Sequence, residues 1–251
     1  MKNPLLAPLT LVGSYVKFLG VVLRKPARSS IFWWRCVHET WELAVRSVWF
    51  VALVSLFIGM VISVELAINI KHPLMPAFVV GFATRDMVLL EMSSTIIALV
   101  LAGKVGSSIA SEIGTMRITE QIDALEVMGV NSAAYLVLPK ILAGIIFFPL
   151  LTSLSFMIAI AGGGIAVVNL GYVSAVDFID GLQYYFHPRY ISYALIKMSV
   201  YGFLITSIPS FCGYYVHGGA LEVGRRSTRG VVDSSIAILV SDLVLTKMFL
   251  G

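Results

Sequence analysis

Charged side chains are scarce in this sequence. Only 13% of its 251 residues are Asp, Glu, Lys or Arg, whereas 58% are hydrophobic, and the mean hydropathy is +0.91. Soluble domains usually carry about 25% charged and about 45–50% apolar residues. A globule of 27.3 kDa cannot hide so much apolar surface in its interior, so lipid has to cover part of it. The shortage of charge therefore excludes an ordinary soluble domain and indicates an integral membrane protein.

Patterns for catalysis and metal binding are also missing. Cys36 and Cys212 lie far apart and fit neither a zinc site nor a disulfide framework, so we interpret both as small apolar residues. Gly103-Lys104 lacks a preceding glycine loop and is followed by Val105, so it cannot cradle a phosphate. The histidines are scattered and predict no metal site: His38, His72, His187 and His217. We expect no enzyme activity, no cofactor and no nucleic-acid partner for this chain itself.

Long apolar runs are what the sequence does contain. A membrane-spanning helix needs roughly 20 mostly apolar residues, and five segments qualify. The third is longer than one crossing requires, so it should tilt or project. The expected spans are Val48–Ile68, Met87–Ser108, Leu138–Leu170, Ile191–Val216 and Val232–Leu250.

The first 46 residues differ from the rest and form a separate segment ahead of a membrane domain at 47–251. Residues 5–45 mix apolar side chains with five Lys or Arg, and Trp33, Trp34 and Trp41 favour the headgroup zone. This composition predicts one or two amphipathic helices on the membrane surface. On the opposite side, Gly171–Tyr190 predicts a short helix outside the bilayer or at its surface.

Positive charges set the expected orientation, because cytoplasmic segments carry an excess of Lys and Arg. Thirteen of the eighteen lie before the first span, between spans two and three, or between spans four and five. The N-terminus is therefore predicted to be cytoplasmic. The other side holds only Lys71, Arg85, Arg189, Lys197 and Lys247.

Small residues recur at helical spacing where the second span ends. Ala102, Gly106, Ala110 and Gly114 form one row, and 103, 107 and 111 form a second. Such rows let helix backbones approach closely in a membrane. Packing within one subunit and a specialised functional role explain these rows of small residues equally well.

A short amphipathic helix is predicted from Thr115 to Val130. Ile118, Ile122 and Leu125 share one face, acidic residues occupy much of the rest, and Gly129 is a natural C-terminal cap. The segment is too polar to span a membrane. Its acidic face disfavours the negatively charged inner leaflet, so docking into a soluble partner fits it better.

Three stretches closely resemble the MlaE/YrbE family of permeases. The longest is LAGKVGSSIASEIGTMRITEQIDALEVMGV at 101–130. The second is RSTRGVVDSSIA at 226–237, leading into DLVLT at 242–246, and the weaker third is FIGMV at 57–61. The resemblance covers roughly residues 45–250.

This resemblance implies an all-α subunit of an ABC transporter in the inner membrane. Members of the family work as dimers and move phospholipids or related lipids between membranes, usually together with an MCE-domain protein. ATP and Mg are bound by a separate ATPase subunit, into which each permease inserts a cytoplasmic coupling helix. Residues 112–129 match that helix and imply these coupling residues: Glu112, Arg117, Glu120, Gln121, Asp123 and Glu126.

One stretch departs from the family pattern. Many relatives carry Arg-Glu-Leu-Gly-Pro near the start of the second span, where this chain has Leu90-Glu91-Met92-Ser93-Ser94. The glutamate is retained, whereas the arginine and the proline are absent. The missing proline favours a less kinked entry into this helix.

Ionisable residues within spans are candidates for function. Glu65, Arg85, Asp86 and Glu91 lie near the far-side ends of spans one and two, where they either meet a lipid head group or pair with one another. A lipid path there would use these candidates: Glu65, Leu66, Ile70, Met75, Phe78 and Glu91. For Asp242 in the last span we favour bonding within the bundle.

Two other classes of function compete with transport. A membrane-embedded lipid enzyme would need a catalytic set near the membrane surface, but the sequence offers only isolated residues. A passive scaffold that anchors other proteins is compatible with the intramembrane charges and the rows of small residues.

Overall fold

The computed structural model describes residues 7–24, 29–70 and 75–250, and within these ranges every regular element is a helix. Lys2, Lys25, Arg28 and Lys71, which contributed to the expected orientation, lie outside them. Residues 7–47 contain α1 (Ala7–Val22), α2 (Ser29–Leu43) and the 3-10 helix η1 (Val45–Ser47). The remaining elements are α3 (Val48–Asn69), α4 (Phe78–Met87), the π-helix η2 (Val88–Ile96), α5 (Ile97–Leu101), the π-helix η3 (Ala102–Gly106), α6 (Ser107–Ile118), α7 (Gln121–Val127), α8 (Ser132–Asn169), α9 (Ala175–Gln183), α10 (Arg189–Tyr214) and α11 (Ala220–Leu250).

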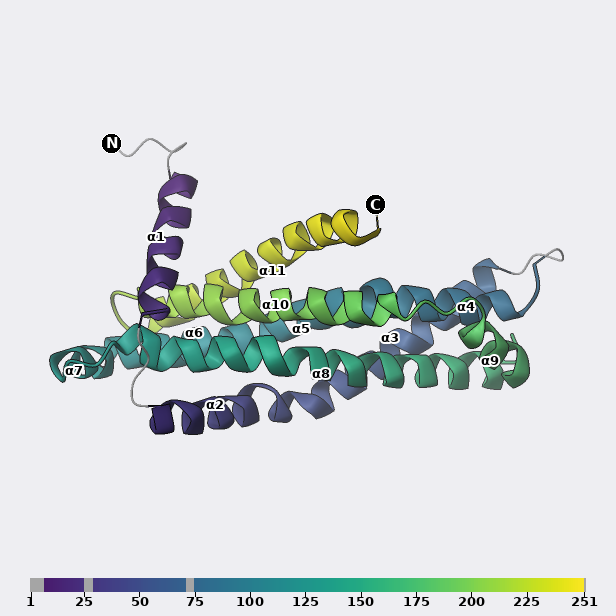
Figure 1. Cartoon of the computed structure of the whole chain (residues 1–251), viewed down its shortest axis with the longest axis horizontal. Coiled ribbons are helices and arrows are strands. Elements are labelled where there is room, and N and C mark those ends of the chain that lie inside the picture. The colour runs from purple at the N-terminus through teal and green to yellow at the C-terminus, as the bar shows by residue number, and fades with distance from the viewer. Residues whose placement is uncertain (1–6, 25–28, 71–74, 251) are drawn as a thin grey trace.

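Long helices lie side by side and give the molecule its elongated shape (Figure 1). α8 has 38 residues, which at 1.5 Å per residue is about 57 Å, far more than the roughly 30 Å core of a bilayer. It packs against α3 on one side and α10 on another. The prediction that this helix projects beyond the membrane is consistent with its length.

Four helical runs in the described residues are long and apolar enough to cross a membrane: Phe32–Asn69, Phe78–Ile118, Ser132–Asn169 and Arg189–Tyr214. They coincide with the first four expected spans, of which the third and fourth end one and two residues beyond the runs, and the all-α membrane fold is confirmed. The expected fifth span is not among them, although it lies inside α11. The physical reason is charge, since Asp233, Asp242 and Lys247 interrupt the apolar residues of α11.

α1 stands across one end of the bundle, in contrast to the long helices that run along it (Figure 1). Phe18 anchors it, because this side chain is buried against the rings of Phe211, Tyr214 and Tyr215. α2 instead runs along the bundle beside α8 and leads through η1 into α3. The two N-terminal helices therefore have different directions relative to the spans.

The row that begins at Ala102 packs inside the subunit. Gly106 lies against Pro209 of α10, and Gly114 lies against Val216 and Val223. The second row remains more open, and a Cβ at Gly103 would meet no neighbouring atom. Packing within one chain thus accounts for the first of the two rows.

Glycine permits the closest contact between α8 and α10. A Cβ on Gly202 would overlap the carbonyl oxygen of Gly144, and the reciprocal substitution would crowd Gly202. At the end of the bundle remote from α1, α9 packs against α4, with Ser174 accepting a hydrogen bond from the Asp177 backbone as an N-cap. This α9 is the short helix predicted between Gly171 and Tyr190.

Candidate functional site

A lysine with two carboxylate partners lies inside the bundle. The Lys197 side chain on α10 is fully buried, and its Nζ lies 2.9 Å from Glu91 Oε2 and 2.5 Å from Asp242 Oδ1. Glu91 comes from η2 and Asp242 from α11, so the ionic cluster joins three helices. With all three groups ionised, the cluster carries a net charge of −1.

Hydroxyl groups surround these charges. Tyr201 donates a hydrogen bond of 2.8 Å to Asp242 Oδ1, and Thr95 donates one of 3.2 Å to Glu91 Oε2. Thr246 is 3.4 Å from Glu91 Oε1. Donors to the anionic oxygens lower the cost of placing charge in a medium of low polarity. The bonding of Asp242 within the bundle, favoured from sequence, is confirmed.

The π-helix η2 determines where Glu91 lies. Its wider turns interrupt the α-helical ladder of the run Phe78–Ile118, and single π turns are frequent at functional sites. The carbonyl oxygen of Leu90, one residue before Glu91, accepts a hydrogen bond of 3.2 Å from Lys197 Nζ. Lys197 thus holds both a side chain and a backbone group of this irregular segment.

A shallow pocket of about 520 Å³ opens beside the cluster and exposes part of both carboxylates. The Glu91 side chain is 37% exposed and that of Asp242 is 18% exposed. α11 supplies two leucines, a hydroxyl group and a cation to the walls of this pocket: Leu239, Leu243, Thr246 and Lys247. The arrangement can present negative charge and hydroxyls to a polar group that enters from the surface of the bundle.

Glu65, the other acidic candidate for a lipid path, lies in a separate place. It lines an open, mostly apolar pocket of about 620 Å³ between α3 and α8, next to Val61 and Ile68. Leu66 and Ile70 are half-buried, and Ile70 packs against a small apolar core near α9. The structure does not bring Glu65 and Glu91 into one pocket.

Met75 and Phe78 also have different surroundings. Met75 is exposed, whereas the ring of Phe78 packs against that of Tyr184, with ring centroids 4.8 Å apart and the planes tilted at 48°. Arg85 is buried, pairs with Asp86 at 2.8 Å and donates to the carbonyl oxygens of Leu182 and Tyr184. The geometry therefore supports an ion pair for Arg85, and its partner is Asp86 and not Glu65.

The predicted amphipathic helix is two helices. α6 continues the second span as far as Ile118, and α7 begins at Gln121 after a break. At the break Glu120 has a left-handed backbone with φ of +61°, an unusual conformation for a residue with a long side chain. The expectation of one helix from Thr115 to Val130 was wrong, because hydrophobic spacing alone does not reveal a single residue that leaves the helical region, and the stretch 112–129 implied by the resemblance contains the same break.

The end of α7 is as the sequence predicts. Gly129 has φ of +76°, its N–H donates to the carbonyl of Glu126, and the N–H of Val130 donates to that of Leu125. These two bonds form a Schellman motif. Ile122 is fully buried and Leu125 packs against the main core, so the apolar face holds α7 to the bundle.

The side chains around α7 are of two kinds: some have ion-pair or hydrogen-bond partners, and others are exposed at the surface. Asp123 pairs with Arg117 at 2.7 Å, and Glu126 accepts hydrogen bonds from Ser132 and Tyr214. Four exposed residues mark the outer surface of α7 and its flanks: Glu120, Gln121, Val127 and Met128. An exposed apolar pair beside acidic and amide groups is suited to contact with another protein.

Glu112 belongs to a second ionic cluster that sequence reasoning missed. The buried Lys140 of α8 lies 2.6 Å from Glu39 on α2 and 2.9 Å from Glu112 on α6. Lys140 therefore ties α2 to α6, the helix that leads to α7. Lys140 and Lys197 both stood in the sequence as lysines within or next to apolar runs, and that position was the available signal for a buried ion pair.

Both cysteines are buried and free, as expected for small apolar residues. Among the described residues, no group of three or more His, Cys, Asp or Glu side chains is arranged to hold a metal ion.

Comparison with known proteins connects this geometry to a family. The model of the family described as Permease MlaE matches residues 36–248. A probable ABC transporter permease of Rickettsia bellii is 42% identical over 160 residues, which are 63% of this chain and 61% of that protein. A probable ABC transporter permease of Rickettsia conorii is 33% identical over 95% of this chain and 92% of its own length. The intermembrane phospholipid transport system permease protein MlaE of Haemophilus influenzae is 30% identical over 86% of this chain and 82% of its own length.

Proposed function

Because the chain belongs to the MlaE permease family, we propose that it is the membrane subunit of an ABC transporter that moves phospholipids or related lipids between membranes. ATP is hydrolysed by a separate ATPase subunit that docks on α7. The name of the Haemophilus relative, an intermembrane phospholipid transport permease, supports the class of substrate.

The exposed outer surface of α7 is the observation that most directly supports the proposal. A buried Ile122 fixes α7 to the core while Glu120, Gln121, Val127 and Met128 remain exposed. α6 is continuous with the helical run that holds Glu91, and α7 follows it after the break at Glu120, so a displacement of α7 reaches the ionic cluster by moving α6. A mobile ATPase that moved α7 would thereby act on the part of the permease that faces lipid.

Two pockets that have apolar walls and acidic residues at their edges support lipid as the transported molecule. Glu65 at the α3–α8 pocket and Glu91 with Asp242 at the α11 pocket place polar groups beside apolar walls. A phospholipid has the same division, with a polar head and acyl chains that require only apolar contact.

The proposed topology places α1, α7 and the N-terminus on the cytoplasmic side of the inner membrane. α11 is the fifth crossing, because Lys197 and Tyr201 compensate the Asp242 charge that excluded α11 by composition. Its outer face is apolar and exposed at residues 236, 239, 240 and 243, a surface available to a second copy of the chain. An MCE-domain protein would receive or deliver the lipid on the opposite side.

The test is a pair of substitutions on the exposed part of α7. Glu120→Lys with Val127→Asp is expected to reduce the ATPase that co-purifies from native membranes at least about tenfold, with the chain still folded. Glu222→Lys is the matched control, since Glu222 is an acidic residue in the first turn of α11, a helix that packs against α6. Retention of both the ATPase and its lipid-dependent activity in the double variant would refute the docking role of α7.

A further inference from the structure

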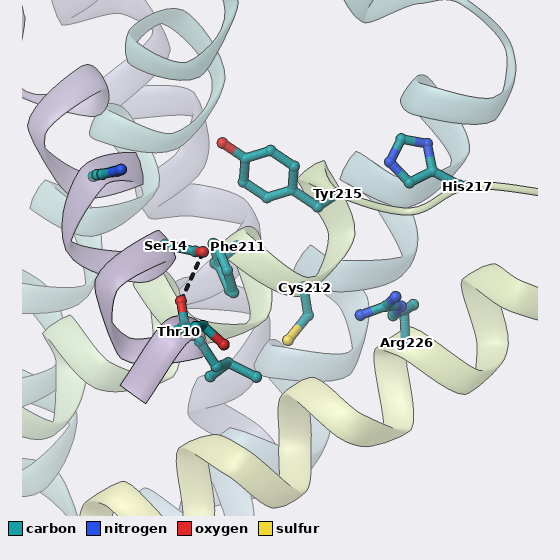
Figure 2. Close-up of a pocket in the computed structure, with 9 residues that line it drawn as sticks. Thr10, Ser14, Phe211, Cys212, Tyr215, His217 and Arg226 are labelled. Atoms are coloured by element: carbon teal, nitrogen blue, oxygen red, sulfur yellow. Dashed lines mark hydrogen bonds between the residues drawn. The ribbon is translucent and has the colours of Figure 1, made fainter. Parts of the chain in front are cut away.

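A basic pocket lies at the α7 end of the bundle, between α1, the end of α10 and the start of α11. Its volume is about 720 Å³, and Lys17, His217 and Arg226 line it together with hydroxyl groups. Figure 2 shows Thr10 and Ser14 of α1 facing Tyr215, His217 and Arg226 across the opening. Residues of α1 thus meet residues 211–226, which are far away in sequence, and the two segments bring cationic side chains and polar donors together.

The cations of this pocket have no acidic partner among the described residues. No ion pair there involves Lys17, His217 or Arg226, although other charges of α11 are matched: Arg225 with Glu222 at 2.8 Å and Arg229 with Asp233 at 3.5 Å. Lys17 and His217 are exposed, and Arg226 is half-buried. The pocket therefore has an excess of positive charge that fits an anion.

An apolar pocket of about 260 Å³ adjoins the basic one and shares Leu11, Phe211 and Cys212 with it. Val12, Ile208 and Ile236 form much of its wall, and the one acidic residue in it is the Asp233 that pairs with Arg229. Together the two pockets make an amphipathic site, basic at one part and apolar at the next. A free phosphate ion would use only the basic part, whereas a lipid would use both.

The wall made by α1 is held in place. Tyr15 and Ser207 share a hydrogen bond of 2.6 Å, Phe18 is buried, and Asn131 donates to the carbonyl oxygen of Val21 at 3.0 Å. These contacts lie along the length of α1, so the pocket does not depend on a ligand to form. A pre-formed site lowers the entropic cost of binding.

We propose that the two pockets bind one anionic phospholipid of the leaflet next to α7, with its phosphate at Lys17 and Arg226 and an acyl chain along Ile208 and Ile236. Basic pockets between membrane helices on the cytoplasmic side are a recurring way to hold anionic head groups. This site lies outside the lipid path candidates and outside the Lys197 cluster. The proposal rests on the topology given under the proposed function, and it does not depend on lipid transport.

Native mass spectrometry of the purified full-length chain tests the proposal. The probes are phosphatidylglycerol and phosphatidylcholine with identical acyl chains, titrated separately. The parent chain is expected to bind phosphatidylglycerol more tightly, and Lys17→Gln with Arg226→Gln is expected to reduce that preference about thirtyfold. Arg225→Gln is the matched control, because Arg225 is exposed and is the neighbour of Arg226.

Four results would overturn the inference. An unchanged preference in the double variant, or an equal loss in Arg225→Gln, would remove the site. Displacement of phosphatidylglycerol by millimolar inorganic phosphate would indicate a phosphate site without a lipid. A change in oligomeric state in place of lipid preference would indicate that a second copy fills the pocket. The assay contains no ATPase, so none of these outcomes depends on whether the chain transports lipid.

Discussion

Replacing Lys197 by methionine removes the only cation of the Glu91–Asp242 cluster in the described residues. Both carboxylates then lie beside one another without their common partner, 2.9 and 2.5 Å from where Nζ had been. Breaking a buried ion pair by removing one member usually costs about 3–5 kcal/mol. Because the Glu91 side chain is 37% exposed, we expect the lower end, about 3 kcal/mol.

The assay is thermal unfolding of the full-length protein in detergent, followed by far-ultraviolet circular dichroism. A loss of about 3 kcal/mol corresponds to a decrease in Tm of roughly 6–12 °C for a chain of this size. Lys247→Met is the control, since Lys247 is exposed on α11 and the same change there should leave the Tm within about 2 °C.

Neutralising the carboxylates separates charge from packing. Glu91→Gln and Asp242→Asn in the Lys197→Met background remove the uncompensated charges, and we expect most of the lost Tm to return. Lipid transport should nevertheless stay impaired if the charges serve the cargo. A parental Tm in Lys197→Met, or a triple variant as unstable as the single one, would refute the view that this cluster is held by ion pairing.

Three further predictions concern other contacts. Lys140→Met should lower the Tm by a similar amount, because Glu39 is almost fully buried, and Glu39→Gln should restore part of it; no change in Tm would refute the ionic tie. Gly202→Ala should cost about 1–3 kcal/mol in the same assay by crowding the Gly144 carbonyl, whereas Gly103→Ala, with open space around it, should cost nothing. Gly129→Val places a branched residue at φ of +76° and should speed limited proteolysis near α7, and the idea fails if Gly129→Asn speeds it equally.

The sequence predicts the spans well because hydropathy is a property of local composition. The run Ser132–Asn169 and the short helix α9 fall where the apolar pattern and the turn residues put them. α11 is the exception, because the span predicted there from the sequence is not among the four helical runs of the described residues that are long and apolar enough to cross a membrane. Its charge at Asp242 is compensated by Lys197 on α10, and no local window contains both residues.

The candidate sites depend even more on contacts between distant segments. Lys197 counted in the sequence as one of the few positive charges on the far side, whereas it is buried between η2 and α11. Glu65 and Glu91 looked like neighbours, but the π-helix and the packing of α10 direct Glu91 to a different pocket. The break at Glu120 is a single backbone conformation with no hydrophobic signal.

The central proposal is that this chain moves lipid between membranes and that a separate ATPase drives the movement. The most direct measurement purifies the chain with its native partners, reconstitutes the assembly in vesicles and follows fluorescent phospholipid between these and acceptor vesicles. We predict movement in one direction that requires ATP hydrolysis and is lost in Glu120→Lys with Val127→Asp. ATP hydrolysis without any movement of phospholipid, or purification of the chain with no ATPase at all, would contradict the account.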